Sequence, residues 1–186
     1  MSTPKNRVPS ESADAVGLIV ALLERFPEIA TLGSHPAEGT LTLSFAIRRR
    51  LDKAAQASLR DAVVEHVDSF MELLEEPLER LEVAFEADNG MTFVRVTRDA
   101  RSLTREELQM LTALVAQKFG DVLVKSPVSG DEGFDEDPAA ADDLVEFALE
   151  ALRDPAQKRG LVGFREEQGA MVYFAPARKK AKARGR

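Results

Sequence analysis

The chain has 186 residues, of which 44% are apolar, and this length and composition are sufficient for one well-buried domain. It contains no cysteine, which excludes disulfides, thiol catalysis and thiolate metal sites. The net charge is −7, and the sequence has neither an apolar run long enough for a membrane helix nor a signal-peptide segment, so we expect a cytoplasmic protein.

The first predicted elements are a helix, a short strand and a longer strand. Residues 12–26 carry apolar residues at helical spacing and are followed by Pro27, which ends the helix. Residues 28–32 predict a short strand. Residues 40–48 form the clearest strand in the sequence, because one set of alternate positions is apolar: Leu41, Leu43, Phe45 and Ile47.

A long helix is predicted over residues 53–76, with Asp52 as its N-cap and Pro77 as its stop. Its apolar stripe comprises Leu59, Val63, His66, Val67, Phe70 and Leu74. His66 has two interpretations: a general base or pH switch, or a partly buried histidine that bonds to a neighbouring backbone carbonyl. The second is favoured, because no acid–base–nucleophile pattern accompanies this histidine.

The segment from Glu79 to Gly120 predicts a hairpin and a capped helix. Asn89-Gly90 is typical of a two-residue hairpin turn. Closing the hairpin there gives three cross-strand pairs: Phe85 with Val94, Val83 with Val96, and Glu86 with Phe93. The helix that follows has three signals: a capping box of Thr104 and Glu107, a hydrophobic staple of Leu103 and Leu108, and Gly120 as the stop.

The rest of the chain predicts smaller elements separated by polar segments. Residues 121–125 predict a final short strand, and residues 127–137 an acidic linker whose carboxylates lack the spacing of a calcium-binding loop. A helix then runs from Pro138 to about Arg153. Residues 161–175 predict a second hairpin around Gln168-Gly169, with Phe164 opposite Tyr173.

Together these elements predict an α+β fold. Strand, helix, strand over residues 40–87 is followed by strand, helix, strand over residues 91–125, which is the order of a ferredoxin-like (split βαβ) plait. We therefore expect a plait domain at 11–126 with an N-terminal helix and strand as an extension. The helix plus β-hairpin at 138–176 should pack on the plait or on a partner. The ends, 1–10 and 177–186, are expected to be disordered.

Charge is sorted along the chain. Six basic residues lie between Arg178 and Arg186, and without them the remaining chain would carry −13. On the helical wheel of the long helix, the carboxylates cluster between about 160° and 260° from Leu59, opposite the apolar stripe. This predicted acidic face comprises Asp61, Glu65, Asp68, Glu72, Glu75, Glu76 and Glu79. Because like charges three or four residues apart destabilise a helix, we interpret the face as a docking surface for a basic partner, with plain solubility as the alternative.

A second candidate surface is a basic run at the start of the long helix. Arg48, Arg49 and Arg50 leave the strand and enter a helix whose first turn includes Lys53. Helix N-termini attract anions, so these four side chains are a candidate anion site for a phosphate-bearing ligand or an acidic peptide. The simpler interpretation, that they only mark the solvated end of a strand, is favoured.

The sequence therefore predicts a non-catalytic protein-interaction module, such as an adaptor, assembly factor or chaperone-like regulatory protein, with no cofactor and no metal. The alternative is a regulatory domain that binds a small ligand or a nucleotide at the anion site, and an enzyme of unrecognised type comes third. An acidic body is a poor binder of nucleic acid, so we expect contact of that kind only weakly through the basic tail. A second copy of the chain is a further candidate partner.

Overall fold

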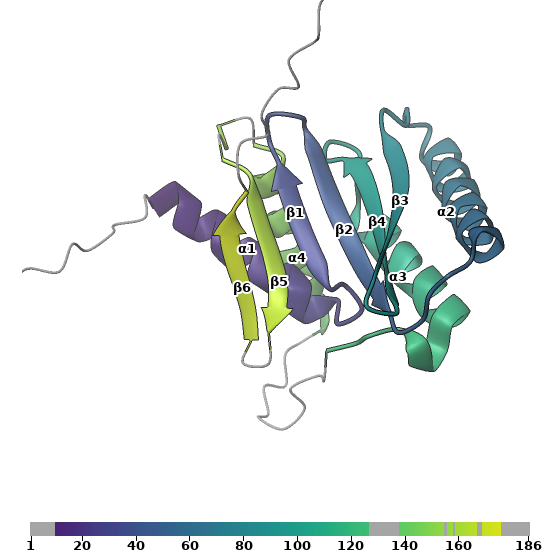
Figure 1. Cartoon of the computed structure of the whole chain (residues 1–186). Helices are drawn as coiled ribbons and strands as arrows, with labels where there is room; N and C mark the ends of the chain where they lie inside the picture. The colour runs from purple at the N-terminus through teal and green to yellow at the C-terminus, as the bar shows by residue number, and fades with distance from the viewer. Residues whose placement is uncertain (1–9, 127–137, 155, 158, 167–168, 176–186) are drawn as a thin grey trace, which may run out of the picture.

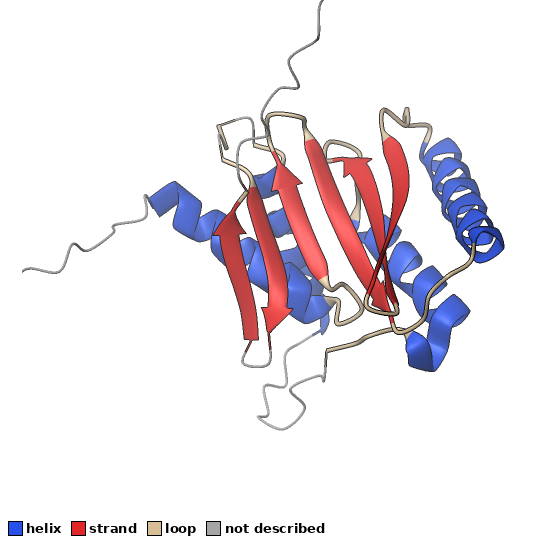
Figure 2. Cartoon of the chain, in the orientation of Figure 1, coloured by secondary structure: helices blue, strands red, loops and turns tan. Residues whose placement is uncertain are grey.

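The computed structural model describes residues 10–126, 138–154, 156–157, 159–166 and 169–175. Within this part of the chain there are four α-helices, one 3₁₀ turn and six strands (Figures 1 and 2). In chain order they are α1 (Ser10–Arg25), β1 (Thr31–His35), β2 (Thr40–Ile47), α2 (Lys53–Leu74), β3 (Leu81–Asp88), β4 (Met91–Asp99), α3 (Arg105–Phe119), η1 (Gly120–Val122), α4 (Pro138–Leu152), β5 (Leu161–Glu166) and β6 (Gly169–Phe174).

The six strands form one antiparallel sheet in the order β3-β4-β2-β1-β5-β6. Helices α1, α3 and α4 cover one face of this sheet, α2 flanks the sheet beside β3, and no described helix covers the other face (Figure 1). The core fills the space between the sheet and the helices. The predicted apolar side of β2 lies in it, with Leu41, Phe45 and Ile47 fully buried. The α+β class is confirmed.

The predicted final strand at 121–125 is wrong. Residues 120–122 form the 3₁₀ turn η1, and only Leu123 bridges to the end of β2, at Ile47. The place beside β2 is taken by β1, which pairs with β2 from Thr40 to Ser44. On that side of β2, only Phe45, Ala46 and Ile47 are not paired with β1, so the chain after α3 forms a single bridge there and no strand.

The hairpin and the helix after it follow the sequence closely. All three predicted pairs of β3 with β4 are confirmed, and Asn89 and Gly90 have the positive φ values, 47° and 80°, that the turn requires. Thr104 caps α3, because its Oγ1 accepts a hydrogen bond from the backbone N of Glu107 at 3.2 Å. The other half of the capping box is wrong, since the Glu107 carboxylate bonds to Arg98 instead.

The C-terminal elements belong to the same layers as the rest. Strand β5 pairs with β1, and α4 lies against α1 behind the sheet (Figure 1). Arg153, which follows α4, donates from Nε to the carbonyl of Ala100 at 3.0 Å and from Nη2 to that of Leu103. The predicted linker, the basic tail and all of the N-terminal segment except Ser10 lie outside the described residues, so these boundaries stay predictions.

Two predicted positions need correction. The first strand is Thr31–His35, not 28–32, because the residues between α1 and β1 are used in a turn in which the backbone N of Ile29 donates to the carbonyl of Phe26. The second hairpin pairs Phe164 with Met171 and not with Tyr173. Gly169 pairs with Glu166, so the hairpin closes one residue earlier than predicted. The rings of Phe164 and Tyr173 still stack diagonally, with centroids 5.3 Å apart.

The cap of α3 can be tested directly. Thr104→Ala should lower the free energy of unfolding by about 1 kcal/mol, because it leaves the backbone N–H of Glu107 without its acceptor. Thr104→Ser keeps a hydroxyl in place and serves as the control. Chemical denaturation measures both, and an unchanged midpoint for Thr104→Ala would show that the hydroxyl contributes nothing to the helix start.

Candidate interaction surface on helix α2

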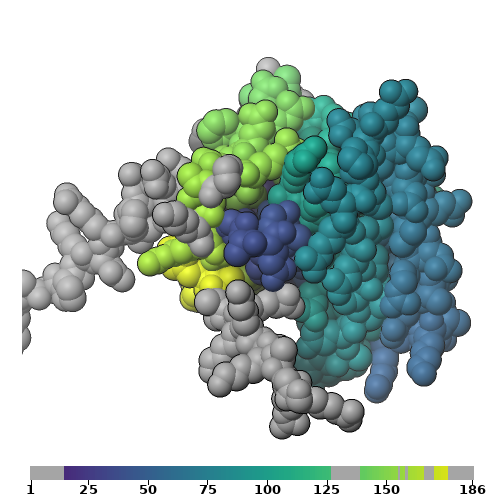
Figure 3. Space-filling view, turned by 90° about the horizontal axis from the view of Figure 1, so that it is seen from above, coloured from purple at the N-terminus to yellow at the C-terminus, as the bar shows by residue number. Residues whose placement is uncertain are grey.

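Helix α2 begins where it was predicted and ends two residues earlier. The Asp52 carboxylate accepts a hydrogen bond from the backbone N of Ala55 at 2.7 Å, which confirms the N-cap. The last helical residue is Leu74, and Glu75 takes a left-handed conformation with φ 55°. This reversal ends the helix before Pro77. The helix forms one side of the molecule in the view from above (Figure 3).

The predicted acidic face is therefore divided. Asp61, Glu65, Asp68 and Glu72 lie on α2 and are exposed. No basic group of the described chain lies within ion-pair distance of these four carboxylates, which we call the α2 acidic face. Glu75, Glu76 and Glu79 follow the helix and are also exposed, and Glu79 forms an ion pair of 3.3 Å with Arg101.

The buried side of α2 differs from the predicted stripe. Its buried residues are Leu59, Val63, Val67 and Met71, at a spacing of four residues. Phe70 is half-buried, Leu74 is 42% exposed, and His66 is exposed. The Nδ1 atom of His66 lies 2.7 Å from the carbonyl oxygen of Ala62, a neighbouring backbone carbonyl as expected, although the side chain is not part of the core.

An apolar groove runs beside the acidic face, between α2 and α3. Its lining residues are Glu65, His66, Ser69, Phe70 and Leu73 of α2 and Met110 of α3. Leu73 is 80% exposed, more than any other large apolar side chain described. Glu65 belongs both to the groove and to the α2 acidic face. Leu73 and Met110 were not predicted as site residues from the sequence, although Leu73 lies off the buried stripe and that position is a signal of exposure.

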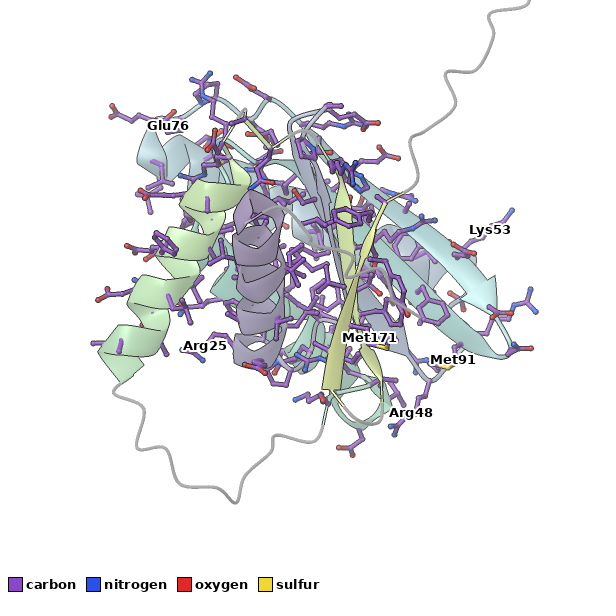
Figure 4. The ribbon with its side chains drawn as sticks, turned by 90° about the vertical axis from the view of Figure 1, so that its left-hand side faces the viewer. Arg25, Arg48, Lys53, Glu76, Met91 and Met171 are labelled. Atoms are coloured by element: carbon purple, nitrogen blue, oxygen red, sulfur yellow. The ribbon has the colours of Figure 1, made fainter. Side chains whose placement is uncertain are left out.

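The structure does not assemble the predicted anion site. Arg48, Arg49, Arg50 and Lys53 are all exposed. Figure 4 shows Arg48 at the lower end of the sheet and Lys53 well apart from it. The amide at the helix N-terminus that an anion would use is already bonded to the carboxylate of Asp52. These side chains therefore form a basic surface without a preformed binding geometry.

The strongest polar cluster is buried and was not predicted. Arg98 of β4 and Glu107 of α3 are both completely buried and form a two-pronged ion pair, with N–O distances of 2.6 and 3.0 Å. Arg98 also bonds to the Asp99 carboxylate, to the carbonyl of Arg80 and to Ser102. All three charged side chains, Arg98, Asp99 and Glu107, are buried, so we assign the cluster to the architecture of the protein and not to chemistry on a substrate.

Burial and charge act against each other in this cluster. Burial raises the pKa of the Glu107 carboxyl above its ordinary value, although the hydrogen bonds from Arg98 act in the opposite direction. Burial also acts to raise the pKa of Asp99, but the hydrogen bond from Ser102 and the charge of Arg98 outweigh it and hold this pKa below its ordinary value. Arg98 thus lowers the pKa of both carboxyls against the effect of burial.

Other site types find no support in the described residues. No group of three or more His, Asp or Glu side chains there could hold a metal ion, and no helix there is long and apolar enough to cross a membrane. Comparison of the chain with protein-family models, curated proteins and solved structures gives no match. The surface of α2 therefore has to be interpreted from its own geometry.

The buried ion pair generates a prediction about stability. Arg98→Met should lower the free energy of unfolding by about 3–5 kcal/mol, because it leaves the Glu107 carboxylate buried without a partner. The loss should shrink as the pH falls, since a carboxyl group with a raised pKa stabilises the fold only while it is protonated. Denaturant titrations over a pH series measure both effects.

The double variant Arg98→Met/Glu107→Leu provides the control, because it removes the Arg98 and Glu107 charges together and leaves only Asp99 without the guanidinium. It should recover the part of the stability, and of the pH dependence, that is due to Glu107. A double variant as unstable as Arg98→Met would mean that the arginine acts through its other bonds, to Asp99, Arg80 and Ser102, and not through Glu107.

Proposed function

We propose that this protein is a non-catalytic protein-interaction module and that α2 docks a basic, amphipathic helix of another protein. Apolar side chains of the partner fill the groove between α2 and α3, and its lysines or arginines face the α2 acidic face. One observation carries the proposal: Leu73, which is 80% exposed, lines an apolar groove that also contains a carboxylate of the acidic face, Glu65.

Neither feature serves the fold of the chain itself. Asp61, Glu65, Asp68 and Glu72 follow one another at spacings of three and four residues, which costs the helix a few tenths of a kcal/mol for each pair. An exposed leucine leaves apolar surface in water. A helix in a groove removes that surface from water, and the carboxylates steer a basic partner toward it. Solubility alone would account for the carboxylates and not for Leu73.

Two further proposals concern the type of fold and the place where the protein acts. We take the unit β2-α2-β3-β4-α3 as a variant of the split βαβ plait in which β1 holds the place of the fourth strand. We also take the protein to act in the cytoplasm, without a cofactor. Both points are supported by the order of the elements and by the cysteine-free composition.

The test uses a synthetic helical peptide as a model partner. Its leucines repeat at helical spacing and its other positions are lysine, and a peptide with glutamate in place of lysine is the matched control. Binding to the full chain is measured by fluorescence anisotropy over a salt series. The lysine peptide should bind and the glutamate peptide should not, and added salt should weaken the binding.

Two variants separate the contributions of charge and of apolar contact. Neutralising Glu65, Asp68 and Glu72 to the amides should weaken binding about tenfold and flatten its salt dependence, while thermal stability stays equal or rises slightly. Leu73→Ser should weaken binding at every salt concentration. The matched control neutralises three exposed carboxylates of β3, namely Glu82, Glu86 and Asp88, and should bind as the wild type does.

The same assay decides between this function and the anion-binding alternative. Equal binding by the wild type and the acid-neutralised variant, without salt dependence, would refute docking on α2. In that case the triple change of Arg48, Arg49 and Arg50 to Gln, tested with an acidic peptide, would show whether the basic surface is the functional one.

A further inference from the structure

The two edge strands of the sheet, β3 and β6, differ in charge and in what lies beside them. Strand β3, at one edge, carries three exposed carboxylates and is flanked by α2. Strand β6, at the other edge, has no charged residue and no proline from Gly169 to Phe174, and its pairing with β5 is regular. Met171, Tyr173 and Phe174 of β6 are between 38% and 50% exposed. An edge without charge, proline or bulge is a template for another strand.

The backbone of β6 presents three residues to such a strand. In an antiparallel pair, residues alternate between those that bond to the neighbouring strand and those whose N–H and C=O point away from it. The backbone N of Ala175 donates to the carbonyl of Gly160 at 2.7 Å, and this pair continues the register of β5 with β6. The groups that point outward therefore belong to Ala170, Val172 and Phe174.

We propose that β6 pairs with β6 of a second copy of this chain, antiparallel and about a two-fold axis, so that the two sheets become one. Val172 would face its own copy at the axis, and Ala170 would face Phe174 of the partner subunit. This arrangement uses all three outward residues of each strand. It does not depend on the function proposed for α2.

The side chains of β6 are suited to self-pairing. Met171 would lie opposite Tyr173 of the partner subunit on the open face of the sheet, which gives two apolar cross-strand pairs. Val172 is partnered by Gly163, whose missing side chain leaves room for Ile19 of α1, so Val172 faces the helix layer. The first turns of α1 extend past β6 (Figure 1), and a strand added there would be covered on that side.

The lack of charge on β6 makes it a place where a second copy can approach. Two chains that each carry −7 repel one another, and β6 is an uncharged surface where they can meet.

The first test measures the mass of the full chain in solution by sedimentation over the micromolar range. The wild type should be a dimer. Met171→Lys/Tyr173→Lys, which places like charges opposite one another on exposed positions, should raise the dissociation constant at least about tenfold. The matched control, Ala84→Lys/Ala87→Lys, adds the same charge to the other edge strand and should dimerise as the wild type does.

The second test reports the register itself and does not require a disruptive variant. Because the chain has no cysteine, Met171→Cys and Tyr173→Cys each introduce a single thiol. Oxidation of a mixture of the two should cross-link chains faster than oxidation of either variant alone, because these positions face each other and lie close enough for a disulfide.

Three outcomes would overturn the proposal. They are a wild-type monomer throughout the concentration range, a dimer that the β6 lysines leave intact, and a mixture of the cysteine variants that cross-links no faster than its components. A β6 that accepts only a foreign strand would give the first of these.

Discussion

The buried ion pair of Arg98 and Glu107 lies where β4, α3 and the end of α2 meet. The N–H groups of Arg98 bond to Asp99 of β4, to Ser102 and Glu107, and to the carbonyl of Arg80 before β3. Its Nη2 also lies 3.6 Å from the sulfur of Met71, the last buried residue of α2. A buried ion pair adds little net stability, because desolvation offsets the attraction. Its geometry, however, joins parts of the chain that are distant in sequence. The guanidinium bonds to α3 and to the chain before β3, and it also contacts the C-terminal half of α2 at Met71.

The place of α2 at the side of the sheet explains why its surface is unusual. A helix that lay across the sheet would bury a wide apolar stripe, whereas α2 buries a line of four residues. At its N-terminal half it is joined to α3 by a hydrogen bond from Lys118 Nζ to Ser58 Oγ at 2.8 Å. The rest of its circumference faces solvent, so apolar and acidic residues stand side by side there. Helix α2 and the carboxylates of β3 protect the β3 edge of the sheet from pairing, whereas the β6 edge has no such protection.

Turns and caps, which neighbouring residues determine, could be predicted from the sequence. Pairings that depend on residues distant in the chain could not. Asn89-Gly90 sets the register of its hairpin within a few residues, and Thr104 finds its donor three residues away, so both could be predicted. The strand expected at 121–125 does not form, because β1, some ninety residues earlier in the chain, pairs with β2 instead. The Glu107 carboxylate could bond either to the backbone N–H of Thr104, as in a capping box, or to Arg98. It bonds to the guanidinium of Arg98, because a buried charge requires an opposite charge. Leu73 of the candidate site was missed because a helical wheel shows which residues share a face and not which face a second helix leaves open.

The two proposed surfaces lie at opposite edges of one sheet, and this geometry links them. Pairing through β6 would leave the α2 acidic face of each copy at an outer end of the joined sheet, about twelve strands or roughly 55 Å apart at 4.8 Å per strand. Two docking faces held at a fixed separation bind a partner with two suitable helices far more tightly than either face alone, because the second contact forms at a high local concentration. The gain disappears when the linker between the helices of the partner cannot cover the separation. A dimer of this shape would therefore select its partners by the spacing of their basic helices as well as by their charge.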